Sequence, residues 1–308
     1  MKNITKFAGA TLVAALLPQA GWACACGCGV FDVGTSWMLP SGQGGMAFLN
    51  YDFQDQNRNW EGTATAPDEN NSDKEIRTDF FSFGLQYMVN YNWGIEAELP
   101  YDYRTFKTAD PAGNLITRSW SQVGDIRLRG IYTGFSPDLS AGLTFGLKLP
   151  SGSYTHDPEV VDRDTQLGTG STDILLGGFY RHNLTRNGKL DWFAQADLDA
   201  PILIQAGYRP GVELDAATGV YYNGWSIGSV RIAPVAQAIV SDRTRDTGIN
   251  AASPAASGYQ RVLLSPGIEV DFHPVRLYAD VEFPIYQNFT GDQLAAPVLF
   301  KFSFNIMF

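Results

Sequence analysis

The C-terminal stretch of the chain reads Val298-Leu299-Phe300-Lys301-Phe302-Ser303-Phe304-Asn305-Ile306-Met307-Phe308. Apolar residues, mostly aromatic, occupy every second position, and Lys301, Ser303 and Asn305 stand between them. A period of two places successive side chains on opposite faces of an extended chain. The stretch therefore predicts a β-strand with one apolar and one polar face, and the same alternation recurs over 81–90 and 93–104.

Segments of this kind follow one another along the chain and are separated by turn residues. Each is about ten residues or longer, which is the length that a tilted strand needs to cross the apolar band of a membrane, roughly 25 Å tall. We predict twelve strands, near residues 45–55, 77–91, 93–105, 120–134, 140–150, 172–183, 190–200, 210–221, 225–240, 259–271, 275–288 and 296–308.

The links between these strands alternate in length. Links after even-numbered strands are short, such as 91–92 and 273–274, whereas links after odd-numbered strands are mostly long, such as 56–76, 106–119 and 151–171. A soluble β-sandwich has no such asymmetry, but an outer-membrane barrel does. The sequence thus predicts an all-β, transmembrane, antiparallel up-and-down barrel over 45–308, in the bacterial outer membrane and with both termini periplasmic.

Aromatic residues gather near the short links, as in the girdle of side chains that sits at a membrane–water interface. They are Tyr91, Trp93, Phe135, Trp192, Trp225 and Phe272. The chain also ends on Phe308 after an alternating aromatic strand. This terminal Phe resembles the signal that the barrel-assembly machinery of Gram-negative bacteria reads.

Composition excludes two other classes of protein. Only the extreme N-terminus of the 308 residues is apolar enough to resemble a membrane helix, so the chain is not a multi-span helical membrane protein. The formal charge of -10 argues against a nucleic-acid partner, because phosphate binding needs clustered Lys and Arg.

The N-terminus has the layout of a secretory signal peptide. Lys2 and Lys6 precede an apolar run over 7–17, and small residues lead to Ala23, which predicts a signal peptide over 1–23. The Cys- and Gly-rich segment 24–44 would then begin the mature chain in the periplasm. It is long enough to enter the barrel as a plug.

The three cysteines of the chain, Cys24, Cys26 and Cys28, all lie in this segment. Three closely spaced thiolates suit a soft metal such as Cu(I) or Zn, and no other cofactor is expected. A local disulfide with one odd thiol, a link to a periplasmic partner protein, and lipidation after cleavage before Cys24 are the alternatives.

Alternation also assigns charged side chains to the barrel interior. An interior with more acids than bases favours passage of cations, unless the charges pair with one another and fill the space. Twelve strands enclose more than side chains readily fill, so either a path or a plug is expected. The predicted lumen-lining residues are Glu96, Glu98, Asp102, Arg104, Asp125, Arg127, Arg129, Lys148, Asp173, Arg181, Asp197, Asp199, Asp280 and Glu282.

Three motifs in the middle of the chain resemble those of an outer-membrane transporter family first associated with meta-cleavage phenol-degradation operons. They are Val123-Gly124-Asp125-Ile126, Leu147-Lys148-Leu149-Pro150-Ser151-Gly152 and Gln166-Leu167-Gly168-Thr169-Gly170-Ser171-Thr172-Asp173. The resemblance implies a barrel that admits hydrophobic or aromatic compounds. The cysteine cluster has no counterpart in it.

No enzyme signature is present among the three histidines, His156, His182 and His273. The sequence therefore predicts a channel for passive uptake of small molecules, hydrophobic or aromatic ones included. The alternative is a closed structural or partner-docking barrel, whose N-terminal cysteines bind a soft metal or a periplasmic electron-transfer partner.

Overall fold

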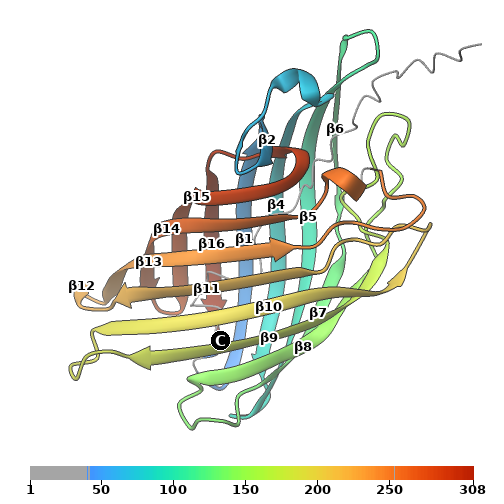
Figure 1. Ribbon diagram of the computed structural model, residues 1–308. Helices are drawn as coiled ribbons and strands as arrows, with labels where there is room; N and C mark the ends of the chain where they lie inside the picture. The colour runs from blue at the N-terminus through green and yellow to red at the C-terminus, as the bar shows by residue number, and fades with distance from the viewer. Residues whose placement is uncertain (1–39, 41, 253) are drawn as a thin grey trace, which may run out of the picture.

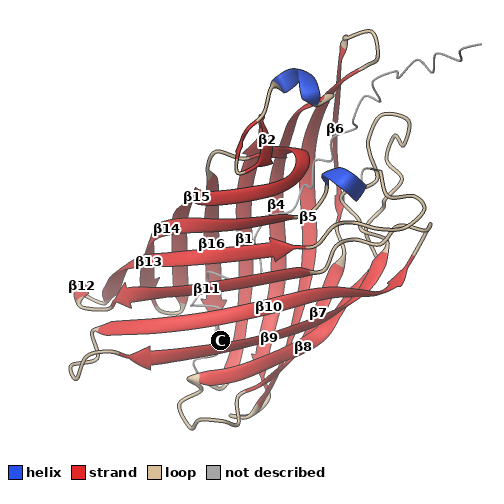
Figure 2. Cartoon of the chain, viewed as in Figure 1, coloured by secondary structure: helices blue, strands red, loops and turns tan. Residues whose placement is uncertain are grey.

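The computed structural model describes residues 40, 42–252 and 254–308, which fold into one antiparallel sheet that closes on itself (Figures 1 and 2). The predicted signal peptide, the three cysteines and most of the predicted plug segment lie outside the described residues. Among the residues described, no helix is long and apolar enough to cross a membrane.

Twelve strands form the wall, and they confirm the prediction of an all-β antiparallel barrel. The periplasmic side of both termini stays a prediction. The wall strands are β1 (Gly44–Gln56), β4 (Asp73–Met88), β5 (Trp93–Ala109), the interrupted strand β6 (Leu115–Val123) and β7 (Ile126–Tyr132), β8 (Ala141–Leu149), β9 (Ser171–Asn183), β10 (Leu190–Ile204), β11 (Glu213–Tyr222), β13 (Val230–Arg243), β14 (Tyr259–Phe272), β15 (Val275–Ala295) and β16 (Leu299–Met307).

The first and last strands close the barrel. β1 and β16 pair antiparallel from Met46 opposite Met307 to Gln54 opposite Leu299. Beyond this ladder, Gly45 and Phe308 exchange two backbone hydrogen bonds, with N···O distances of 2.7 and 2.9 Å. Closure leaves no free sheet edge along this seam, as a sheet surrounded by lipid requires.

The two faces of the wall differ as the alternation predicts. Outward side chains are exposed and apolar, as on β4, where Phe83, Leu85 and Tyr87 point away from the barrel. Inward neighbours such as Thr78 and Gln86 are buried. Five of the six predicted girdle residues, Tyr91, Trp93, Phe135, Trp225 and Phe272, are exposed near the short links, and Trp192 is half-buried.

Part of the interior is an apolar core. Its buried members come from strands β10 to β16 and the link that precedes β16, and they share the inward face with charged residues. They are Phe193, Ala217, Val235, Ile239, Leu263, Tyr278, Ala296 and Leu299. In Figure 1, strands β10 to β14 run across the front of the barrel, while β1, β4 and β5 stand upright behind them.

Several predicted boundaries were wrong at the end of the barrel where the long links gather, called here the long-link end. The predicted link 106–119 is mostly strand, because β5 and β6 continue as a hairpin with a turn over 110–114. The predicted link 56–76 contains the short strands β2 (Arg58–Gly62) and β3 (Ala64–Thr65) and the 3-10 helix η2 (Asp68–Asn70). β15 continues to Ala295 because its final part pairs with β2.

Two more strands differ from prediction. Residues Trp225–Ile227 form a separate strand, β12, that folds back on the start of β13, so the wall strand begins at Val230. The predicted strand 120–134 is interrupted at Gly124 and Asp125, and β6 pairs only with β5, whereas β7 lies between β5 and β8.

One close contact inside the wall gives a test of packing. Phe48 on β1 lies opposite Gly84 on β4, and a Cβ atom added to Gly84 would lie 1.8 Å from Cζ of the Phe48 ring. We expect Gly84→Ala to lower the free energy of unfolding by about 1–3 kcal/mol, because overpacking moves the buried ring. Urea-induced unfolding in detergent measures this change.

Two further variants make the result specific. Phe48→Ala in the Gly84→Ala background should remove most of the clash, so the two costs would not add. Gly178→Ala, whose added Cβ would lie 3.2 Å from the flexible Leu143 side chain and 3.5 Å from the carbonyl oxygen of Gly142, should have little effect. If the losses in free energy of unfolding from Gly84→Ala and Phe48→Ala simply added in the double variant, the packing account would be contradicted.

Candidate functional site

The link over residues 150–170, called here loop 150–170, folds against the inside of the barrel at the long-link end. Val161 is buried in an apolar cluster with Ile76 on β4 and Phe106 on β5. Nη1 of Arg104 on β5 donates a 2.6 Å hydrogen bond to the carbonyl oxygen of Thr165. The loop therefore contacts the interior face of the wall and narrows the space inside.

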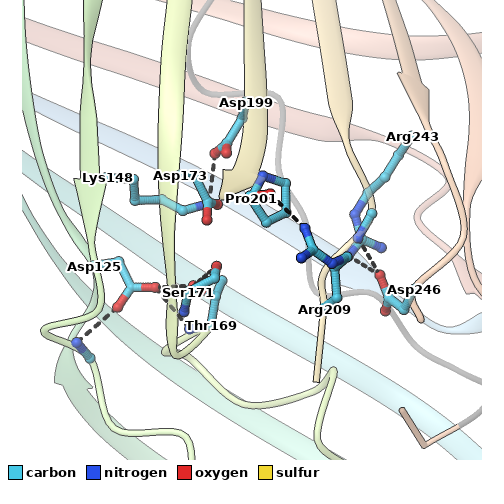
Figure 3. Close-up of polar contacts among 12 residues, drawn as sticks. Asp125, Lys148, Thr169, Ser171, Asp173, Asp199, Pro201, Arg209, Arg243 and Asp246 are labelled. Atoms are coloured by element: carbon cyan, nitrogen blue, oxygen red, sulfur yellow. Dashed lines mark hydrogen bonds and ion pairs between the residues drawn. The ribbon is translucent and has the colours of Figure 1, made fainter. Parts of the chain in front are cut away.

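Asp125, at the interruption between β6 and β7, holds both ends of this loop (Figure 3). Its Oδ1 accepts a hydrogen bond from the backbone N–H of Gly152 at 2.9 Å. Its Oδ2 accepts from the backbone N–H of Thr169 at 2.8 Å and from the Thr169 hydroxyl at 2.5 Å. Hydrogen bonds to a carboxylate are among the stronger ones in proteins, so Asp125 holds the two ends of the loop together. These contacts of Asp125 with Gly152 and Thr169 are called here the clamp.

The three sequence motifs meet at this clamp. Ser151 Oγ donates to the carbonyl oxygen of Gly124 and accepts from the N–H of Ile126, each at 2.9 Å. Gly152 and Gly168 lie so close that a Cβ on either would come within 2.8 Å of the other's Cα. The glycines of the second and third motifs are thus needed for the two ends of the loop to touch.

Lys148 on β8 forms ion pairs with carboxylates on the next two strands of the sheet. Its Nζ lies 2.5 Å from Oδ2 of Asp173 on β9 and 2.6 Å from Oδ2 of Asp199 on β10 (Figure 3). All three side chains point to the interior, where an unpaired charge would be costly. These interior charges therefore neutralise one another in part. This agrees with the alternative in which charged residues pair and fill the interior instead of lining an open lumen.

Arg163 fixes the middle of loop 150–170. Its guanidinium lies between two aromatic rings, 4.2 Å from the ring centre of Tyr154 and 4.4 Å from that of Tyr208. It also donates a 2.5 Å hydrogen bond to the carbonyl oxygen of Thr169. Cation–π contacts of this kind are strongest away from water.

A second carboxylate, Asp246, lies in the link after β13 and accepts hydrogen bonds from three residues. Its oxygens accept hydrogen bonds from Nη2 of Arg243 at 2.6 Å, from the hydroxyl of Tyr208 at 2.8 Å and from the N–H of Gly211 at 2.7 Å. In the same region Arg209 donates to the carbonyl oxygen of Pro201 at 2.7 Å (Figure 3). This group connects the link over 205–212 to loop 150–170 through Tyr208.

Asp164 in loop 150–170 is the exception among these carboxylates. Both of its oxygens are buried, and no side chain among the described residues donates a hydrogen bond to them. Burial, and then the negative charge of Asp246, raise the pKa of Asp164 to about 7.

These groups surround a cavity of about 140 Å³ inside the barrel. Five cationic and three acidic side chains line it together with apolar and aromatic ones. The charged lining residues are Asp102, Arg104, Asp125, Arg127, Lys148, Arg163, Asp164 and Arg243, and the apolar ones include Phe80, Leu167 and Tyr208.

The other predicted lumen residues form separate groups. On β5 and β7, Nη1 of Arg129 lies 3.2 Å from Glu96 and 3.4 Å from Glu98, and Arg127 lies 3.8 Å from Glu98. Asp102 is buried on β5 beside the cavity. Asp197 on β10 packs over Gly177, where a Cβ would come within 2.3 Å of its carboxylate.

Two further groups lie on the opposite part of the wall and at the short-link end. Asp280 accepts hydrogen bonds from Tyr278, Ser265 and Gln237 at 2.5, 2.6 and 3.0 Å, and Glu282 lies 3.7 Å from Nζ of Lys301. Arg181 donates to the carbonyl oxygen of Pro40 at 2.9 Å.

Alternation did not identify the loop residues Arg163, Asp164, Tyr208 and Asp246, because a loop has no period to read. The only signal available was the third motif, whose Thr169 proves to be a partner of Asp125. The fourteen predicted residues thus have inward positions, but they occupy several paired groups rather than one ring.

The clamp predicts a specific effect on the loop. Asp125→Ala removes the acceptor of three hydrogen bonds and leaves two backbone N–H groups buried without a partner, at about 1–3 kcal/mol each. We expect loop 150–170 to loosen and trypsin to cleave after Arg163 at least about tenfold faster. Asp125→Asn keeps one acceptor oxygen, so its cleavage rate should lie between those of the wild type and Asp125→Ala. An unchanged rate of cleavage in Asp125→Ala would refute the role of Asp125 in holding the loop.

Asp164 predicts a pH dependence. A carboxyl group whose pKa is raised on folding adds stability below its ordinary pKa near 4, and this stability is lost as the pH rises towards about 7. The thermal unfolding temperature of the protein in detergent should therefore fall between pH 5 and pH 8. In Asp164→Asn this fall should be smaller, and the free energy of unfolding at pH 8 should be about 1–3 kcal/mol higher than that of the wild type. Equal pH profiles would contradict the assignment.

No protein-family model and no curated relative matches the chain. Among solved structures, the COG4313 outer membrane channel from Pseudomonas putida F1 is similar, with a TM-score of 0.61 and 14% identity over 88% of this chain and 97% of that one. The β domain of the Bordetella autotransporter BrkA has a TM-score of 0.53 and 12% identity over 86% of this chain and 100% of that one. The likeness shows the fold, and together with the apolar outer surface it points to the bacterial outer membrane.

Proposed function

We propose that the protein is an outer-membrane channel for passive uptake of small molecules, hydrophobic and aromatic ones included, and not an enzyme. The observation that carries the proposal is a closed barrel with an apolar outside and a polar, charged cavity inside. A barrel that served only as a structural anchor would have no need for buried charges, which are costly to keep in an interior.

The chemistry of the interior supports passage of small polar solutes. Ionised groups along a lumen replace part of the water that a solute loses on entering. Carboxylates outnumber basic residues among the predicted lumen residues, so the pathway should favour cations over anions. The cavity itself has more basic than acidic neighbours, so we expect this section of the path to tolerate anions better than the rest.

Aromatic and apolar solutes are supported by the other part of the cavity lining. Phe80, Leu167 and Tyr208 offer apolar surface beside the charged groups, a combination typical of sites for small ligands. The three motifs that resemble the phenol-degradation transporter family converge on the same region through Asp125. The COG4313 protein, which has a similar fold, is itself described as an outer membrane channel.

Loop 150–170 sets the size limit in this proposal. It lies against the interior face and is held by Asp125, Arg104 and Arg163, so it narrows the route at the long-link end. Small solutes would pass beside the loop, and larger ones would be excluded.

Planar-bilayer recording of the full-length protein tests the proposal. We expect a small, steady conductance whose reversal potential in a KCl gradient favours K⁺ over Cl⁻. Small aromatic solutes added to one chamber should interrupt this current, whereas a sugar of similar size should not. Asp125→Ala, by loosening the loop, should raise the conductance, and a silent wild-type barrel would contradict a channel.

A second candidate is the closed, partner-docking barrel. The apolar core across β10 to β16 and the inserted loop favour it, because both fill the interior. In this case Cys24, Cys26 and Cys28 bind a soft metal or a thiol of a periplasmic partner. A silent barrel that co-purifies with a partner, or with copper or zinc that a triple Ser variant loses, would support this candidate over the channel.

A further inference from the structure

The cavity beside loop 150–170 is about the size of one aromatic ring. Its volume is about 140 Å³, and an apolar cavity of roughly 150 Å³ holds a benzene molecule. Phe80 on β4, Leu167 in the loop and Tyr208 in the link over 205–212 give the cavity apolar surface. A single ring therefore fits, whereas two fused rings would require the lining to move.

Arg163 brings a positive charge to this cavity, and its contacts are with uncharged groups. Its guanidinium lies between the rings of Tyr154 and Tyr208 and donates to the carbonyl oxygens of Gly168 and Thr169, at 3.4 and 2.5 Å. Its Nε atom is buried and has no hydrogen-bond partner in the part of the chain that the structure describes. Burial accordingly lowers the pKa of this guanidinium. A cation that has lost water and has only neutral contacts would be stabilised by an anion.

The surrounding chain holds this guanidinium in place. A Cβ on Gly170 would lie 2.7 Å from Nη2 of Arg163 and 2.8 Å from the ring of Tyr154, so glycine at this position leaves room for the stacked group. The hydroxyl of Tyr208 donates to Asp246 at 2.8 Å, which fixes the second ring. Arg163 is therefore positioned before any solute arrives, and this lowers the entropic cost of binding.

The other basic side chains of the lining have acidic neighbours. Nζ of Lys148 lies 2.6 Å from Asp199, and Nη2 of Arg243 lies 2.6 Å from Asp246. On β5, Asp102 lies near the positive charges of Arg104 and Arg127, which act favourably on it. These carboxylates leave less of the basic charge of the wall available to a solute.

The two remaining acids of the lining do not pair with Arg163. Asp125 accepts the three hydrogen bonds of the clamp, and its charge favours that of Arg163 without an ion pair between them. Burial raises the pKa of Asp164 to about 7, so part of this carboxyl is neutral at neutral pH. The surroundings of Arg163 thus favour a further negative group.

We propose that this cavity binds a single-ring aromatic acid, with the solute carboxylate at Arg163 and the solute ring against Phe80, Leu167 and Tyr208. A guanidinium has more N–H donors than two carbonyl oxygens use, and its hydrogen bonds to carboxylates are strong. The inference rests on the proposed channel function and narrows its aromatic solutes to one class, the aromatic monocarboxylates. Carboxylates are in excess among the predicted lumen residues, so this cavity would give such an anion a favourable position on an otherwise repelling path.

Calorimetric titration of the full-length protein in detergent tests the site with benzoate and benzamide, which differ in charge but hardly in shape. Benzoate should bind at least about tenfold more tightly than benzamide, because a hydrogen bond between two charged groups is stronger. It should also bind at least about tenfold more tightly than 2-naphthoate, whose fused rings exceed the cavity.

Variants of two arginines make the result specific. Arg163→Gln should remove the preference for benzoate over benzamide, and Arg163→Lys, which keeps a positive charge, should retain part of it. Arg118→Gln is the matched control, since Arg118 pairs with Asp157 of the same loop but does not line the cavity, and it should keep the full preference. Heat-modifiable mobility on gels checks that each variant is folded.

The ratio of the two affinities separates binding of the anion from a purely structural role. If Arg163 only held the loop, Arg163→Gln and Arg163→Lys would weaken benzoate and benzamide by the same factor, and this result would overturn the proposal. Equal binding of the two compounds by the wild type would overturn it too, even in a barrel that conducts. A barrel that is silent in planar bilayers but still prefers benzoate would contradict the channel and support the site.

Discussion

Lipid offers no hydrogen bonds, so the backbone N–H and C=O groups of the wall must find partners within the chain. A sheet meets this demand only when its last strand pairs with its first, and here β16 pairs with β1 along its whole length. The exchange between Gly45 and Phe308 continues the seam to the end of the chain. Closure in turn divides the side chains into an outward set that must be apolar and an inward set that must fill or line an enclosed space.

The inward set has two different solutions in this barrel. On β10 to β16 it includes Phe193, Ile239 and Leu263, which pack into an apolar core. On β5 to β9 it includes Arg129, Lys148 and their carboxylate partners, which form ion pairs across strands. The cavity described above lies beside these ion pairs. Apolar packing and ion pairs together fill much of a barrel that is wider than side chains alone readily fill.

The period of two in the sequence was enough to predict the barrel, the outward apolar face and the inward positions of charged residues such as Glu98 and Asp280. It could not predict which charges pair, because a pair such as Lys148 and Asp199 joins strands that are not consecutive and depends on register. The hairpin extension of β5 and β6 was missed because residues 106–119 lie beyond the apolar band, where polar strands and polar loops look alike. The folding back of β12 depends on tertiary pairing with β13 that a local pattern does not encode.

The interruption of the fourth wall strand helps to hold loop 150–170 against the interior. Gly124 and Asp125 leave the regular ladder between β6 and β7, and this frees the Asp125 carboxylate to point towards the ends of loop 150–170. A loop that enters an interior brings backbone groups that need partners there. Asp125 supplies acceptors for its N–H groups, and Arg104 supplies a donor for the carbonyl of Thr165. Asp125 therefore connects the strand break to the constriction, because it lies at the break and supplies acceptors that hold the two ends of the loop.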